Sequence, residues 1–183
     1  MTASRYVLRS AAFVAAYLVV FLVCAAFPWF PVPAVAVAAI WLTAQGRFGQ
    51  RRFDVIMLAT TAAVGATLDG ASLLMCAVVA ILTVVPALFY AMVMDRRLPG
   101  YWLGHGDRFR RPRAALVKLA GIAPLTAFTS LVLEGVADTG FDVGPALLRA
   151  AALAAVLFLA PLAIRATRTH SDRQGRPTLT VVR

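Results

Sequence analysis

The sequence contains few charged residues, only two cysteines and only two histidines. Of its 183 residues, 61% are hydrophobic and 14% are charged, whereas soluble globular proteins are about 45–50% apolar and about 25% charged. This shortage of charge excludes an ordinary water-soluble domain. Because a bilayer-spanning helix needs about 20 residues, several such helices would use most of the chain. A separate soluble catalytic domain of normal size is therefore also excluded.

Catalytic and metal-binding motifs are lacking as well. The chain has no HExxH, CxxC or P-loop motif, and His105 and His170 lie outside the long apolar runs. Haem ligation by paired imidazoles within a membrane bundle is therefore not expected, and no three convergent metal ligands are visible. The segment 104–107 resembles a glycine-rich phosphate loop but lacks its third glycine. We expect no enzymatic activity, metal or cofactor.

Long apolar runs dominate the rest of the chain and predict an all-α integral membrane bundle. The six predicted transmembrane helices cover about residues 10–29, 33–45, 54–68, 71–94, 114–134 and 143–165. The second run is short, so it predicts either a full span extended by Trp29 and Phe30 or a shorter helix packed inside the bundle. Residues 1–166 form one predicted transmembrane domain, and residues 167–183 a polar, flexible cytoplasmic tail.

Basic residues are concentrated on one predicted side of the membrane. If both termini are cytoplasmic, every lysine and arginine except Arg149 lies in or beside an inner segment, and acidic residues such as Asp69 and Asp142 lie on the outer side. This positive-inside pattern predicts an even number of spans in the plasma (inner) membrane. The net charge of +10 does not indicate nucleic-acid binding, because no polar fold is present to carry a basic face.

Two sets of charged residues are candidate sites. Glu134 ends the fifth predicted span and Arg149 lies near the outer end of the sixth, so they could pair across the outer mouth of the bundle and gate or read a ligand. Alternatively, Arg149 extends to the outer interface and Glu134 is solvated. Inner arginines could dock a protein partner or hold anionic lipid head groups. They are Arg51, Arg52, Arg96, Arg97, Arg108, Arg110, Arg111 and Arg113.

Two further residues have a predicted structural role. Asp54 stands at the start of the third predicted helix, where a carboxylate complements the helix dipole. Trp41 is an exception among the tryptophans, since it could face the bundle interior rather than a membrane interface.

Three stretches of the chain resemble the first type of bacterial membrane-associated sensor domain, the MASE group. They are the proline-to-Trp-Leu segment 33–42 with the following Gly46-Arg47, the segment 51–72 that begins Arg51-Arg52-Phe53-Asp54, and the segment 96–113 that begins Arg96-Arg97-Leu98-Pro99-Gly100. The resemblance covers roughly residues 30–125. Ala36 departs from it, because the family pattern usually has glycine there.

The resemblance implies a membrane sensor. Members of the group are usually joined to a cytoplasmic output domain, such as a diguanylate cyclase or a histidine kinase, and this chain has no such domain. The resemblance therefore implies a stand-alone or truncated sensor that signals through a separate partner. Two alternatives stay open: the substrate-binding subunit of an energy-coupling-factor vitamin transporter, which is similar in length and span number, and a scaffold of a cell-envelope assembly.

Overall fold

The computed structural model describes residues 3–27, 33–44, 51–99, 101, 112–137 and 142–174. These residues form six α-helices and no strand, so the all-α prediction is confirmed. The helices are α1 (Ala3–Ala26), α2 (Ala34–Ala44), α3 (Arg51–Leu68), α4 (Leu73–Arg97), α5 (Pro112–Val136) and α6 (Val143–Gln174). Alanine and leucine dominate them, and both residues favour the helix strongly.

Four of the helices are long and apolar enough to cross a membrane. The qualifying segments are Tyr6–Ala26, Leu73–Arg97, Arg113–Val136 and Val143–Ala166. Only 11% to 33% of the residues in their apolar windows are buried inside the protein. Most of the apolar side chains therefore face outward. In water they would form an exposed apolar surface far larger than soluble monomers carry. These are the features of a membrane protein.

The other two helices differ from a standard span. The first turn of α3 is charged, because it contains Arg51, Arg52 and Asp54. The helix α2 has 11 residues, which at about 1.5 Å per residue reach about half of the ~30 Å hydrocarbon layer. Most of its side chains are buried, including that of Trp41. The described helix is the shorter one packed inside the bundle, while Trp29 and Phe30, which the other alternative adds to the span, lie outside the described residues.

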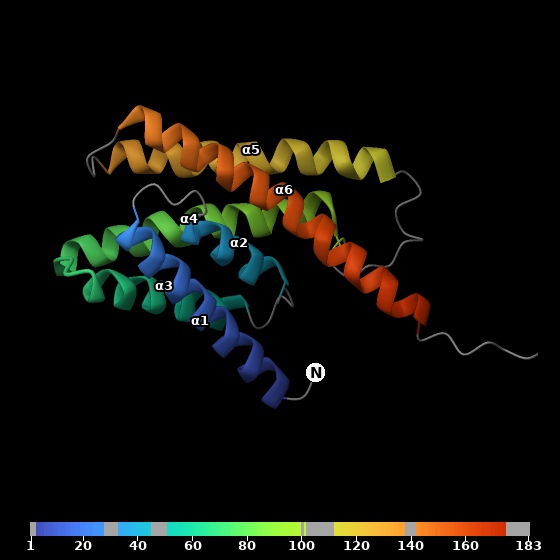
Figure 1. Cartoon of the computed structure of the whole chain (residues 1–183), viewed down its shortest axis with the longest axis horizontal. Helices are drawn as coiled ribbons and strands as arrows, with labels where there is room; N and C mark the ends of the chain where they lie inside the picture. Colours follow the sequence, from blue (N-terminus) through green and yellow to red (C-terminus); the bar gives the residue numbers. More distant parts are fainter. Residues whose placement is uncertain are drawn as a thin grey trace, which may run out of the picture.

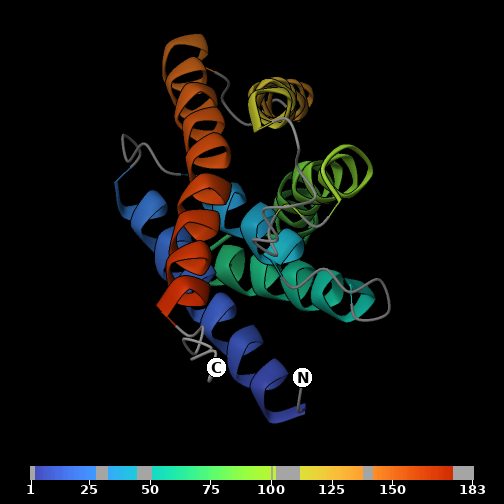
Figure 2. The same cartoon turned by 90° about the vertical axis from the view of Figure 1, so that its right-hand side faces the viewer.

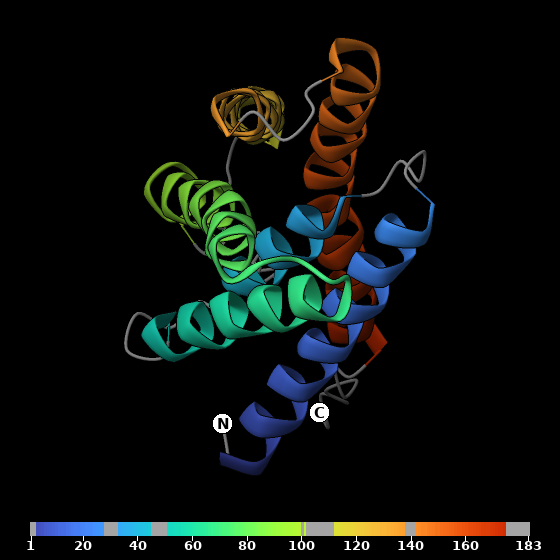
Figure 3. The same ribbon diagram turned by 90° about the vertical axis from the view of Figure 1, so that its left-hand side faces the viewer.

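Helix α2 lies at the centre of the bundle, as Figures 2 and 3 show. It packs against α1, α3, α4 and α6, while α5 lies outside, against α4 and α6. The small side chains of Ala36, Ala38 and Ala39 are fully buried and allow the neighbouring helices to approach closely. The Trp41 ring stacks on Phe13 of α1 with ring centroids 5.9 Å apart. The core is therefore built around the most weakly predicted helix.

Successive helices run in opposite directions (Figure 1): α1, α3 and α5 run one way, and α2, α4 and α6 run back. We call the end at which α1 begins and α6 ends the basic end. Arg51, Arg52, Arg96 and Arg97 lie there, at the start of α3 and the end of α4. The other end, where α5 ends and α6 begins, is called the opposite end. Six consecutive membrane spans would alternate in this way.

Two helix boundaries differ clearly from the sequence prediction. Helix α1 begins at Ala3 rather than near residue 10, and α6 continues to Gln174. The first part of the segment 167–183, predicted as a flexible tail, is therefore helical. Hydropathy marks where a membrane stretch ends, but a helix continues until a breaker such as glycine or proline stops it. Neither residue occurs between Pro161 and Gln174.

A tight turn connects α3 to α4 and sets them side by side. Gly70 has a φ of 82°, and the N–H of Ala71 donates to the carbonyl of Ala66 at 2.9 Å, which are features of a Schellman C-cap. Ser72 then caps α4, because its Oγ accepts from the N–H of Met75 at 3.4 Å. This hairpin brings the start of α3 next to the end of α4.

The contact between α1 and α3 gives a stability prediction. A Cβ added at Gly65 of α3 would lie 2.9 Å from Cδ1 of Phe21 on α1. We expect Gly65→Leu to overpack this contact and to lower the free energy of unfolding by about 1–3 kcal/mol, measured as a lower Tm in detergent. Gly121→Leu is the matched control, because a Cβ there meets no atom within 4 Å. Equal Tm values for the two variants would contradict the packing.

Candidate functional site

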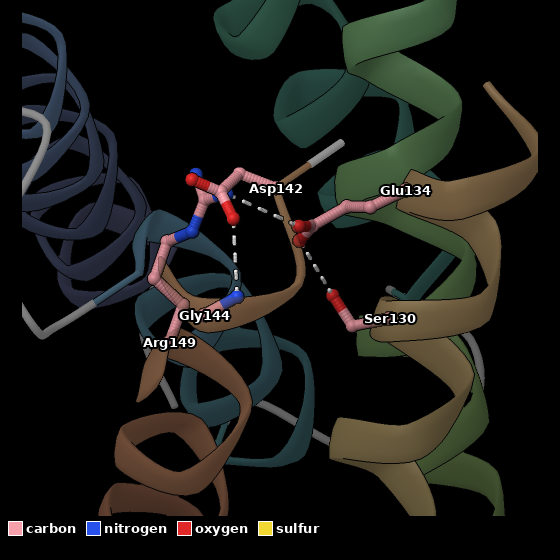
Figure 4. Close-up of polar contacts among 5 residues, drawn as sticks. All are labelled: Ser130, Glu134, Asp142, Gly144 and Arg149. Atoms are coloured by element: carbon pink, nitrogen blue, oxygen red, sulfur yellow. Dashed lines mark hydrogen bonds and ion pairs between the residues drawn. The ribbon is translucent and has the colours of Figure 1, made fainter. Parts of the chain in front are cut away.

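The structure brings Glu134 and Arg149 together at the opposite end of the bundle. Nη2 of Arg149 lies 3.8 Å from Oε2 of Glu134, and Oγ of Ser130 donates to Oε1 of Glu134 at 3.4 Å. Ser130 and Glu134 are one turn apart on α5, so their side chains share a face of the helix, and Arg149 reaches them from α6 (Figure 4). The resulting ion pair joins the two helices near their connection.

Asp142 adds a second carboxylate to this cluster (Figure 4). Its Oδ1 accepts from the N–H of Gly144 at 3.3 Å, and its carbonyl accepts from the N–H of Ala146 at 3.1 Å. It therefore caps the start of α6 and complements the helix dipole there. Two carboxylates accompany one guanidinium in this cluster.

A small hollow adjoins the ion pair. Its volume is about 10 Å³, which is room for about one water molecule. It is lined by Pro33, Ser130, Leu131, Glu134, Ala146, Arg149, Ala150 and Leu153. A ligand would have to widen this hollow to place an anionic group at Arg149 or a cationic group at Glu134.

The Glu134–Arg149 pair is loosely held. The two side chains are 28% and 44% exposed, and their closest atoms are 3.8 Å apart. A pair so exposed stabilises the fold by about 0–1 kcal/mol. A charged ligand could therefore replace one partner at little cost to stability.

A second charged cluster lies at the basic end. Nη1 of Arg51 on α3 lies 2.6 Å from Oδ2 of Asp95 on α4, and these side chains are 13% and 26% exposed. Oη of Tyr6 on α1 donates to Oδ1 of Asp54 on α3 at 2.9 Å. Asp54 lies in the first turn of α3 as predicted, but its carboxylate is also buried and joins two helices. Sequence reasoning missed both of these contacts.

The arginines that were predicted to dock a partner differ in exposure and in pairing. Arg52, Arg96, Arg97 and Arg113 are exposed. Arg51 differs from them, because its pairing with Asp95 turns it into a structural residue. The other predicted docking residues, Arg108, Arg110 and Arg111, lie outside the described residues.

Besides the ion pair at the opposite end, helix α6 makes a charged contact near the basic end. Cζ of Arg165 lies 5.0 Å from the centroid of the Tyr101 ring, which is within the range of a cation–π interaction. Tyr101 follows α4 and is buried. This contact therefore connects the later part of α6 to the end of α4.

A buried hydrogen bond holds α6 in the middle of the bundle. Oη of Tyr90 on α4 donates to the carbonyl oxygen of Leu157 on α6 at 2.8 Å. Pro161 stands four residues after Leu157 and has no N–H, so the helix cannot supply a donor for that carbonyl. Tyr90 replaces the missing donor. The proline signals a free carbonyl in the sequence, but which side chain satisfies it depends on packing.

Among the described residues, no group of three or more His, Cys, Asp or Glu side chains could hold a metal ion.

Comparison with protein-family models, curated proteins and solved structures finds no match to this chain. The resemblance to membrane-associated sensor domains stays a prediction.

The two ion pairs should differ in their effect on stability. We expect Asp95→Asn to lower the free energy of unfolding by about 2–4 kcal/mol, because it removes the ion-pair partner of Arg51, whose side chain is only 13% exposed. Glu134→Gln should cost less than about 1 kcal/mol. Both variants remove one carboxylate charge and keep its shape, so Tm in the same detergent compares them directly. A larger decrease in Tm for Glu134→Gln than for Asp95→Asn would contradict this ranking.

Proposed function

We propose that the protein is a non-enzymatic membrane sensor module that signals or docks through a separate protein partner. A stimulus in the membrane or at the opposite end would change the packing of α6, and the basic end would transmit that change. The observation that carries the proposal is the hydrogen bond from Tyr90 to the Leu157 carbonyl. It holds the middle of a helix that also makes a charged contact towards each end.

The proposed topology has six membrane helices in the plasma membrane, with both termini and the basic end in the cytoplasm. The alternating helix directions support it. The position of the arginines at the ends of α3 and α4 also supports it, because cytoplasmic loops are rich in Lys and Arg. In this topology α2 is a half-length helix inside the bundle, and the Glu134–Arg149 pair faces the outside.

The hydrogen bond between Tyr90 and the Leu157 carbonyl is strong enough to hold α6 and weak enough to be broken reversibly. Hydrogen bonds between membrane helices contribute about 0.6 kcal/mol on average and up to about 1.7 kcal/mol. Separating Tyr90 from Leu157 would leave a buried carbonyl without a donor, which raises the cost of the alternative packing. A ligand that favours that packing by a similar free energy could still shift the equilibrium.

The opposite end supplies a candidate input for this sensor. The Glu134–Arg149 pair connects α5 to the first turns of α6 and borders a hollow with room for about one water molecule, which a ligand would have to widen. A ligand that separates the pair would release α6 from α5 at this end. The hollow gives no particular support to a vitamin-transport role, because it is smaller than typical ligand pockets.

Coupling along α6 can be tested with distance measurements. Spin labels would be attached at Met92→Cys and Ala163→Cys, both exposed, in a background in which Cys24 and Cys76 are changed to alanine. Double electron–electron resonance then reports the α4–α6 distance. We expect Glu134→Gln at the opposite end to shift or broaden this distance distribution in the otherwise unchanged protein.

In a Tyr90→Phe background, which removes the hydroxyl, the distribution should already be broadened, and Glu134→Gln should add little. Tyr17→Phe is the matched control. It removes a hydroxyl hydrogen-bonded to Thr83 Oγ1 at 3.1 Å, away from α6. If Glu134→Gln has no effect, or if Tyr17→Phe acts like Tyr90→Phe, the coupling proposal is wrong.

The role of a partner needs a separate experiment in the native host. We expect crosslinking in intact cells, followed by purification in mild detergent, to recover the protein with a signalling protein that has a kinase or cyclase domain and no sensor of its own. Recovery of the protein alone with a tightly bound small molecule would overturn the proposal and favour transport. Recovery with envelope-synthesis proteins would overturn it in favour of a scaffold.

A further inference from the structure

Exposed arginines surround the place where α3 begins and α4 ends. The Arg51–Asp95 ion pair, with its closest atoms 2.6 Å apart, holds these two helix ends together. Arg52 follows Arg51 on α3, and Arg96 and Arg97 follow Asp95 on α4. All three are exposed. The ion pair therefore brings three exposed arginine residues to one junction.

The junction carries uncompensated positive charge. Asp95 neutralises Arg51, but among the described residues no carboxylate forms an ion pair with Arg52, Arg96 or Arg97. The carbonyl end of α4 gives Arg96 and Arg97 a favourable dipole, which does not satisfy their hydrogen-bond donors. Each guanidinium has five N–H donors in a planar fork that matches phosphate oxygens.

Two exposed apolar side chains follow Arg52 on α3. Phe53 is 67% exposed and Ile56 is 59% exposed. Ile56 stands four residues after Arg52, so both lie on one face of α3. Along this face, a charged group at the helix start is followed by apolar groups toward the middle of the bundle. A phospholipid has the same order, with an anionic phosphate followed by acyl chains.

We propose that this junction is a binding site for an anionic phospholipid. The phosphate lies among the guanidinium groups of Arg52, Arg96 and Arg97, and an acyl chain lies along Phe53 and Ile56. Charge complementarity favours this occupant over a zwitterionic lipid, because basic side chains are attracted to an anionic head group and gain little from one without net charge. The site would bind lipid whether or not the protein is a sensor, so it goes beyond the proposed function.

Thermal unfolding in detergent with added lipid tests this site. We expect phosphatidylglycerol to raise the Tm of the unchanged protein more than phosphatidylcholine with the same acyl chains. The double variant Arg96→Gln/Arg97→Gln should lose most of that rise. The matched control is Lys118→Gln, compared with Arg96→Gln alone. It removes the same charge from an exposed residue of α5 and should keep the rise. Comparing rises rather than absolute Tm values removes the effect of the lost dipole interaction.

Two further measurements distinguish binding of the phosphate group from binding of the acyl chain. Inorganic phosphate at the same concentration should give little rise, and Phe53→Ser should reduce the rise with phosphatidylglycerol. If the α4 double variant does not fold, Arg52→Gln compared with Lys118→Gln makes the same test with single changes. Three results would overturn the proposal. The control variant could lose as much of the lipid-induced Tm rise as the α4 variant, the two lipids could raise Tm equally, or inorganic phosphate could raise Tm as much as phosphatidylglycerol.

Discussion

Inside a membrane, every buried backbone N–H and C=O group must find a partner within the protein, and much of this structure follows from that constraint. The constraint explains why the described residues are helical. It also explains the caps between α3 and α4, where Gly70, Ala71 and Ser72 satisfy or cap the helix ends. Pro161 breaks the rule locally, since it cannot donate to the Leu157 carbonyl, and Tyr90 of a neighbouring helix restores it.

The same constraint gives α6 its particular position. A helix without proline satisfies its own interior carbonyls and can slide against its neighbours without leaving one unpaired. In α6, one interior carbonyl depends on a side chain of α4. Movement of α6 therefore carries a defined, moderate cost at one place. Interior prolines also occur in α4 and α5. What distinguishes α6 is that it also makes a charged contact towards each end of the bundle, which is the basis for treating it as the element that could connect the two ends.

Charged residues divide into those that hold helices together and those that remain free to bind other molecules. Asp54 is buried and Asp95 is 26% exposed near the basic end, and each binds a residue of another helix. These contacts position the exposed Arg52, Arg96 and Arg97 around one junction. At the opposite end, the weaker Glu134–Arg149 pair is more exposed and leaves α5 and α6 more easily separated. The stronger pair therefore lies at the basic end and the looser one at the opposite end.

The sequence by itself determined the fold class, the approximate place of each helix, and the gathering of arginines at alternate connections, because hydropathy and charge act residue by residue. It also placed Glu134 and Arg149 at the same level of the bundle, since each stands near the end of an apolar run. It did not determine that α2 forms the centre, that Arg51 is paired while Arg52 is free, or that Tyr90 meets Leu157. Adjacent arginines look alike in sequence, and only the rotation of α3 against α4 decides which one faces Asp95. Tertiary packing alone decided these contacts, because each joins helices whose relative positions no local pattern encodes.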